Sequence, residues 1–366
     1  MTTAINSYDD LGGASLLQWI GDEVLLQQFM ANQSVSVLLI IIVVCIALLS
    51  KGADWMIDGV VDLARRTGMP KIVIGATVVS LGTTLPEMFV SVMAAYMGNP
   101  GLALGNGVGS IIADTGLIFG ITAILVAVPV NRYILNRTGW VQVGSAVLLV
   151  GLAIMALFSA PQGEQPILQR WVGFFFLGLL VVYMYVTYLW ARKGGAGETA
   201  QEEVYHEDMM STWVAWIMVV GGLLLVVIGA RILVPAASEI AVRLGVPEDV
   251  IAATMVAFGT SLPELMTAIA SVRKGHPEII VGNIVGADVL NVLFVVGAAA
   301  AATPLVIPEN FYSFHFPAML IILISFRVFI SINKNGVFYR WQGVWLLGVY
   351  AIYVILQYVL NIGSAH

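Results

Sequence analysis

A segment of the chain occurs twice, 177 residues apart, and each copy carries one glutamate inside an apolar run: Glu87 and Glu264. The stretch Gly75–Gly120 aligns with Ala252–Gly297 without a gap, with 15 identities in 46 positions. A carboxylate at mid-membrane depth costs several kcal/mol and persists only where it faces a cation, a polar partner or water. The duplication therefore predicts one buried site, shared by two equivalent segments.

The composition supports a membrane location for these segments. Of the 366 residues, 59% are hydrophobic and only 10% are charged, and the mean hydropathy is +0.93. A soluble protein of this size needs far more polar surface. A bilayer core of about 30 Å requires roughly 20 apolar residues per helix. We predict ten transmembrane helices, at about 34–64, 71–97, 101–128, 140–158, 168–191, 211–244, 248–273, 277–303, 313–332 and 338–361.

The duplication extends beyond the aligned segment, since Gly52-Ala53 matches Gly229-Ala230 at the same spacing. Each half is then a five-helix unit, and because five is odd, the second unit enters the membrane from the opposite side. The predicted fold is an all-α polytopic membrane protein of two inverted five-helix repeats. Its predicted divisions are an N-terminal extracytoplasmic tail (1–33), a first repeat (34–192), a cytoplasmic linker (193–210) and a second repeat (211–366).

Basic residues in the loops predict the orientation. Most of them, including Lys71, Arg137 and Lys274, fall on one predicted face, and only Arg170 and Arg243 fall on the other. Cytoplasmic loops carry the excess of Lys and Arg, so we expect both termini to be extracytoplasmic in a multi-pass protein of the cell (inner) membrane. We expect it to work as a monomer in the lipid bilayer, without a cofactor and without nucleic acid.

The sequence around each glutamate favours cation binding. The first copy reads GTTLPE over 82–87 and the second reads GTSLPE over 259–264. A proline within a helix removes one backbone N–H and frees a carbonyl about four residues earlier, and a freed carbonyl in lipid must find a new partner. Hydroxyls lie three and four residues before each glutamate. The resulting all-oxygen environment suits hard cations such as Ca²⁺ and Na⁺.

A second motif follows in each copy, GNGVGS over 105–110 and GNIVGA over 282–287. Its glycines allow close helix packing. Ser110 and Asp114 lie one helical turn apart on one face, and Asn291 is the equivalent of Asp114 in the second copy. These polar residues could complete the site from the neighbouring helix.

Together the motifs resemble the two α-repeats of the sodium/calcium exchanger family, which belongs to the cation/Ca²⁺ antiporter superfamily. Within that family the chain resembles a microbial-type member. The resemblance covers about 46 residues in each half. It implies that Glu87 and Glu264 bind Ca²⁺, together with carbonyls at Thr83 and Thr260. It also implies that Na⁺ uses hydroxyls and amides at positions that map onto Thr84, Ser110, Ser261, Asp114 and Asn291.

The chain departs from the family pattern at three places. Ala287 stands where the family usually has serine, which removes one hydroxyl from a candidate sodium site. Asp288 stands where asparagine is common and adds a possible fourth intramembrane carboxylate. In the pair Asp114 and Asn291, the acid sits in the first repeat rather than the second.

The resemblance implies a secondary active antiporter that exchanges Ca²⁺ for Na⁺ by alternating access. Two glutamates neutralise one Ca²⁺ or two Na⁺, whereas an empty site keeps a charge of −2 in a low-dielectric setting. Surplus carboxylates such as Asp114 and Asp288 leave H⁺ as an alternative counter-ion, and another divalent cation as an alternative substrate. A cation channel is a more remote alternative. The sequence contains no Walker A, H-E-x-x-H or G-x-S-x-G motif, so none of these patterns predicts an enzyme.

Overall fold

The protein is described by a computed structural model that covers residues 23–67, 71–96, 98, 100–129, 132–161, 164–194, 210–244, 261–333 and 336–359. The helices of the first half are α2 (Glu23–Ala31), α3 (Val35–Thr67), α4 (Lys71–Ile74), η2 (Gly75–Val79), α5 (Ser80–Thr83), α6 (Leu85–Tyr96), α7 (Pro100–Ala113), η3 (Asp114–Phe119), α8 (Gly120–Leu125), α9 (Arg132–Ser159) and α10 (Arg170–Gly194), where η marks a π-helical segment.

The helices of the second half are α11 (Thr212–Arg243), α14 (Leu262–Arg273), α15 (Pro277–Leu290), η5 (Asn291–Val296), α16 (Gly297–Ala302), η6 (Phe311–His315), α17 (Phe316–Ile332) and α18 (Arg340–Val359). Two short strands, β1 (Ile167–Leu168) and β2 (Leu305–Val306), pair antiparallel and connect the two halves.

The helices confirm an all-helical polytopic membrane fold. Among the described residues, seven helical stretches are long and apolar enough to cross a membrane, and the bent stretch 71–96 makes eight if it forms one span. The predicted span 248–273 begins outside the described residues, which contain its last part as α14. Most of the predicted linker 193–210 also lies outside them, as do residues 1–22 of the predicted tail, whose end forms α2.

The proline of the first motif bends its helix as the sequence predicts. The stretch Lys71–Thr83 meets α6 at an angle of 40°, with the break at Thr84, two residues before Pro86. In the second half, α14 begins directly after Ser261 with Pro263 in its first turn. Each motif glutamate therefore lies in the first turn of a helix that starts within the bundle.

Element boundaries repeat at the spacing of the sequence duplication. The starts of α14, α15, η5 and α16 follow those of α6, α7, η3 and α8 by 262 − 85, 277 − 100, 291 − 114 and 297 − 120, which is 177 residues each time. The two π-helical turns η3 and η5 thus begin at equivalent residues, Asp114 and Asn291. Single π-turns inside α-helices occur frequently at functional sites.

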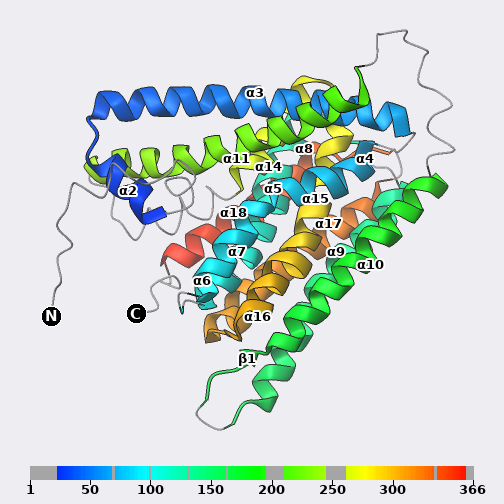
Figure 1. Cartoon of the computed structure of the whole chain (residues 1–366). Coiled ribbons are helices and arrows are strands. Elements are labelled where there is room, and N and C mark those ends of the chain that lie inside the picture. The colour runs from blue at the N-terminus through cyan, green and yellow to red at the C-terminus, as the bar shows by residue number, and fades with distance from the viewer. Residues whose placement is uncertain are drawn as a thin grey trace.

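Helices α3 and α11 form a pair that lies across the remaining bundle (Figure 1). Glycine allows their backbones to touch: a Cβ on Gly52 would stand 2.7 Å from the carbonyl oxygen of Gly222, and a Cβ on Gly222 would stand 2.5 Å from that of Gly52. At the positions 177 residues away, Gly229 faces the backbone of Cys45. The contact between Gly52 of α3 and Gly222 of α11 therefore has a counterpart between Gly229 of α11 and Cys45 of α3, in which the two helices exchange roles.

Polar contacts attach this pair to its surroundings at its ends. Lys274, at the C-terminal end of α14, forms an ion pair with Asp58 of α3 at 2.7 Å. Arg66 of α3 donates a hydrogen bond to Thr212 of α11 at 3.5 Å. Arg243 of α11 donates one to the backbone oxygen at the end of α2, at 2.9 Å. The first contact joins the pair to the bundle, and the other two hold the pair and α2 together.

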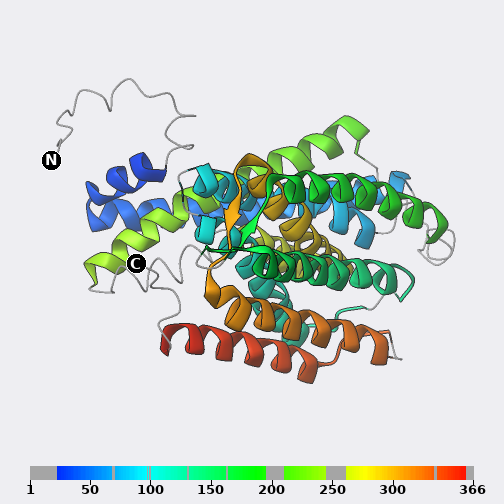
Figure 2. The same cartoon turned by 90° about the horizontal axis from the view of Figure 1, so that it is seen from below.

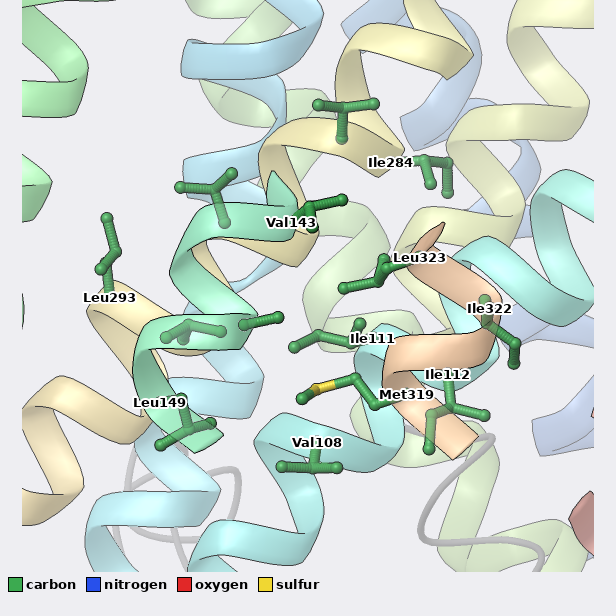
Figure 3. Close-up of a cluster of buried hydrophobic side chains, with 14 of the residues drawn as sticks. Val108, Ile111, Ile112, Val143, Leu149, Ile284, Leu293, Met319, Ile322 and Leu323 are labelled. Carbon is green, nitrogen blue, oxygen red and sulfur yellow. The ribbon is translucent and has the colours of Figure 1, made fainter. Parts of the chain in front are cut away.

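The apolar core has separate parts. The main cluster fills the bundle, and Figure 3 shows side chains of α7, α9, α15, η5 and α17 meeting in it, among them Val108, Leu149 and Met319. A second cluster lies beneath the α3–α11 pair and includes Met56 and Val219. The α3–α11 pair thus contacts the bundle through its own apolar layer.

Viewed from below, α18 lies at one edge of the bundle beside α17 (Figure 2).

Candidate functional site

The two motif glutamates are buried and interact with each other. Glu87 in α6 and Glu264 in α14 are each 1% exposed, and the charge of Glu264 acts on the carboxylate of Glu87. The Oε2 atom of each has no hydrogen-bond partner within the described residues. Both sit in a first helical turn, where the helix dipole favours a negative charge. A buried carboxylate oxygen without a donor at this depth is suited to a cation.

Thr83 connects the two halves next to these glutamates. Its side chain is fully buried, and its Oγ1 lies 3.3 Å from the backbone oxygen of Ser80 and 3.4 Å from Oδ1 of Asn283, either of which can accept its one hydrogen. It also lies beside the carboxylate of Glu264. The predicted partner in the second repeat, Thr260, lies outside the described residues. Thr83 therefore brings a first-half hydroxyl to second-half groups.

The other predicted hydroxyl and amide ligands are also buried. Thr84, Ser110, Ser261 and Asn291 are at most 3% exposed. The hydroxyl oxygens of the first three, and Oδ1 of Asn291, find no hydrogen-bond partner in the part of the chain that the structure describes. Polar groups buried without a partner cost free energy. Their oxygens are therefore available to an ion.

Asp114 lies near the motif glutamates and Asp288. It opens η3, is 1% exposed, and interacts electrostatically with Glu264 and Asp288, while Glu87 in turn responds to Asp114. Ser261 lies beside it, outside hydrogen-bonding geometry. Residues from four separate segments thus place their carboxylates in one buried region.

Asp288 differs from the other acids because donors hold one of its oxygens. Thr115 Oγ1 and Gln142 Nε2 both donate to Asp288 Oδ2, at 2.5 Å and 2.6 Å. Asp288 Oδ1 accepts no hydrogen bond from the described residues. These contacts connect α15 to η3 and α9.

Several polar residues at this region were missed by the sequence analysis. Asn106 donates from Nδ2 to the backbone oxygen of Glu87 and to Ser91 Oγ, both at 3.0 Å, and Asn283 accepts from Thr83. Gln142, buried in α9, is outside the duplicated motifs. An amide in the middle of an apolar span was the signal that could have identified Gln142.

The carboxylates alone do not make a metal shell. Within the residues described, no three His, Cys, Asp or Glu side chains stand close enough together to hold a metal ion by themselves. Ca²⁺ takes six to eight oxygen ligands, which can include hydroxyls, amides and backbone carbonyls. Such an ion would therefore need the unpartnered hydroxyls and amides around Glu87 and Glu264 as well as the two carboxylates.

Known proteins of similar sequence and structure match most of this chain. The chain is 28% identical over 363 residues to the sodium/calcium exchanger MaX1 of Methanosarcina acetivorans, with 89% of this chain and 100% of that protein covered. It is 31% identical over 327 residues to the inner membrane protein YrbG of Escherichia coli, covering 88% and 97%. The solved structure of the sodium-calcium exchanger NCX_Mj, soaked with Na⁺ and Sr²⁺, matches with a TM-score of 0.73 and 27% identity, covering 88% of this chain and 99% of that one.

The family described as sodium/calcium exchanger protein matches this chain twice, at residues 37–189 and 214–359. One match falls in each half, and together they include both motif glutamates and the equivalent π-helical turns η3 and η5. The chain therefore belongs to the sodium/calcium exchanger family.

Proposed function

We propose that the protein is a secondary active antiporter that exchanges Ca²⁺ for Na⁺ by alternating access, at a site built on Glu87 and Glu264. Membership of the family makes it a membrane transporter of cations rather than an enzyme. The single observation that carries the site assignment is the buried glutamate pair, contributed by the two halves and left with unpartnered oxygens. The names of MaX1 and NCX_Mj support Ca²⁺ and Na⁺ as the substrates.

The charges explain why such a site would exchange ions rather than leak them. Two ionised glutamates balance one Ca²⁺ or two Na⁺, so the loaded forms have similar electrostatic energies. An empty pocket keeps two like charges in a low-dielectric setting, where their repulsion and desolvation are costly. The protein would therefore change conformation readily only when loaded.

The proposed ligands are those whose oxygens face this region. For Ca²⁺ they are Glu87 and Glu264 with carbonyls at Thr83 and Thr260, and for Na⁺ they are Thr84, Ser110, Ser261, Asp114 and Asn291. The burial of all the described members supports this set. Proton-driven exchange is the second candidate because Asp114 is a further buried carboxylate that a bound Ca²⁺ would not neutralise.

We also propose that the two halves are inverted five-helix repeats and that the α3–α11 pair slides against the other helices. The contacts Gly52 to Gly222 and Gly229 to Cys45 support a two-fold exchange of the halves, since adding 177 to one residue and subtracting it from the other converts one contact into the other. The separate apolar layer beneath the pair supports sliding. Carriers with inverted repeats commonly alternate access in this way.

The orientation with both termini extracytoplasmic rests on the positive-inside pattern, and a location in the cell (inner) membrane is supported by the description of YrbG. We propose that the monomer is the working unit because both halves of the site come from one chain.

Uptake of radioactive Ca²⁺ into proteoliposomes, with outward gradients of Na⁺, K⁺ or H⁺ imposed one at a time, tests the proposed function. Saturable uptake driven by the Na⁺ gradient alone is expected. Uptake driven only by the H⁺ gradient would replace Na⁺ by the proton as counter-ion. Flux that does not saturate and needs no counter-ion would indicate a channel and refute antiport.

A further inference from the structure

The buried pair of Asp288 and Gln142 has properties that the proposed exchange site does not use. Each side chain is at most 1% exposed. Gln142 Nε2 and Thr115 Oγ1 both donate to the same carboxylate oxygen, Asp288 Oδ2, at 2.6 Å and 2.5 Å. Both hydrogen bonds from these neighbours are therefore accepted by one oxygen of the carboxylate, Oδ2.

The other oxygens of this pair have no donor. Asp288 Oδ1 and Gln142 Oε1 each have no hydrogen-bond partner among the residues that the structure covers. The hydrogen bond between Gln142 Nε2 and Asp288 Oδ2 holds the amide and the carboxylate side by side, so these two free oxygens belong to adjacent groups. Buried amide and carboxylate oxygens are almost always paired with a donor, a water or an ion.

The surroundings are negative. Asp114 and Glu264 both interact electrostatically with Asp288, and no Lys, Arg or His of the described residues forms an ion pair with it. A Ca²⁺ ion held by Glu87 and Glu264 is already balanced by those two charges. Asp288 then needs a cation or a proton of its own, because an isolated ionised carboxylate within a membrane protein is costly.

We propose that Asp288 Oδ1 and Gln142 Oε1 bind a monovalent alkali cation, Na⁺ or K⁺, at a site separate from the Glu87–Glu264 pair. One carboxylate matches one positive charge, and an amide oxygen supplies a second hard ligand. A divalent ion would be only half neutralised by this single carboxylate. The Thr115 and Gln142 donors fix the carboxylate so that Oδ1 remains available.

The experiment measures the thermal unfolding midpoint of the purified full chain in detergent. Ca²⁺ is kept saturating, and choline chloride is replaced by NaCl or KCl at constant ionic strength. An ion that binds only the folded state raises the midpoint, and we expect a saturable rise of about 2 °C or more with at least one alkali ion. The two salts identify which ion binds.

Three variants assign the effect. Asp288→Asn removes the charge and Gln142→Leu removes the amide oxygen, and each should abolish the rise. Gln342→Leu is the matched control, since Gln342 of α18 is equally buried but pairs with Asn333, the residue directly after α17. It should lower the midpoint in every salt and retain the rise. If Asp288→Asn does not fold, Gln142→Leu still tests the site.

Binding of radioactive Na⁺ or Rb⁺ to the Ca²⁺-saturated protein gives an independent count, with loss of one bound ion expected in Asp288→Asn. The proposal is overturned if the wild-type midpoint is the same in choline, Na⁺ and K⁺, if both site variants keep the full rise, or if the midpoint follows pH but no alkali ion. The Glu87→Gln variant should lose stabilisation by Ca²⁺ and keep the alkali effect, so this site and the proposed exchange site can fail separately.

Discussion

Thr83 Oγ1 lies 3.4 Å from Asn283 Oδ1, and this hydrogen bond joins a hydroxyl of the first half to an amide of the second inside the bundle. The same Thr83 side chain lies beside Glu264. The polar groups of the two halves therefore form one connected layer. A change to either motif glutamate should act on the same bound ion.

Replacement of a motif glutamate is the first prediction. Glu87→Gln and Glu264→Gln should each abolish Ca²⁺ exchange, because one remaining carboxylate leaves Ca²⁺ half neutralised in a dry pocket. We expect Ca²⁺ binding to weaken by at least about 100-fold, which corresponds to about 3 kcal/mol. Radioactive Ca²⁺ uptake into proteoliposomes measures the exchange.

Glu309→Gln makes the same chemical change on an exposed side chain and should leave uptake unchanged. Elution of each variant as a monodisperse peak in detergent would show that it is folded. Near-normal exchange by Glu87→Gln or Glu264→Gln would exclude the glutamate pair as the site.

Much of the fold could be predicted because its strongest determinants are local. Runs of apolar residues predict the long helices, and Pro86 predicts the bend before α6, which the structure confirms at 40°. The π-helical form of η3 and η5 could not be predicted, since a π-turn depends on packing between helices rather than on propensity. The helical form of residues 23–31 depends on contacts of Leu26 and Met30 with α3 and α11.

The candidate site likewise has a part that could be predicted from the sequence and a part that could not. Its carboxylates could be identified because an acid in an apolar run is conspicuous, whereas the donors around them could not be assigned. That Gln142 contacts Asp288 depends on how α9 packs against α15, 146 residues away in sequence. The role of Asn106 as a donor to the backbone oxygen of Glu87 likewise follows only from the packing of α6 on α7.

Asp114 is the subject of the second prediction. Asp114→Asn should raise the Na⁺ concentration for half-maximal exchange by about tenfold, equal to about 1.4 kcal/mol, and should change Ca²⁺ affinity less. Ca²⁺ is balanced by the two glutamates, whereas three Na⁺ would need a third charge. The variant also removes a buried group that can exchange protons, so the dependence of exchange on pH should change. Flux assays over a Na⁺ series and a pH series measure both; unchanged curves in both would make Asp114 structural.

The third prediction concerns the close contact within the α3–α11 pair. Gly222→Val should destabilise the protein by about 1–3 kcal/mol, since a Cβ there would stand 2.5 Å from the Gly52 oxygen. Gly221→Val is the matched control because no neighbouring atom lies within 4 Å of a Cβ at that position. Thermal unfolding in detergent compares the two. Equal midpoints would show that the pair tolerates separation at this point.

The fourth prediction tests sliding. With Cys45 replaced by alanine, cysteines at Asp58 and Lys274 joined by a short bifunctional thiol reagent should stop transport and preserve Ca²⁺ binding, since this link fixes α3 to the end of α14. Cysteines at Arg66 and Thr212 provide the control because they link α3 only to α11. That link should leave transport intact if the two helices move together. Full transport with the first link in place would contradict sliding.

The ion pair between Asp58 and Lys274 has no counterpart on the opposite side of the duplicated fold. The equivalent positions are occupied by Pro235 and Met97, which carry no charge. Under the proposed sliding, a perfectly symmetric duplicate would have two end states of equal energy, whereas this contact and the Asp54–Arg273 pair at 3.8 Å would lower the energy of one of them. Salt screens such pairs. If the pair slides as proposed, the resting preference between the two end states should depend on ionic strength, and the forward and reverse half-cycles should be energetically unequal.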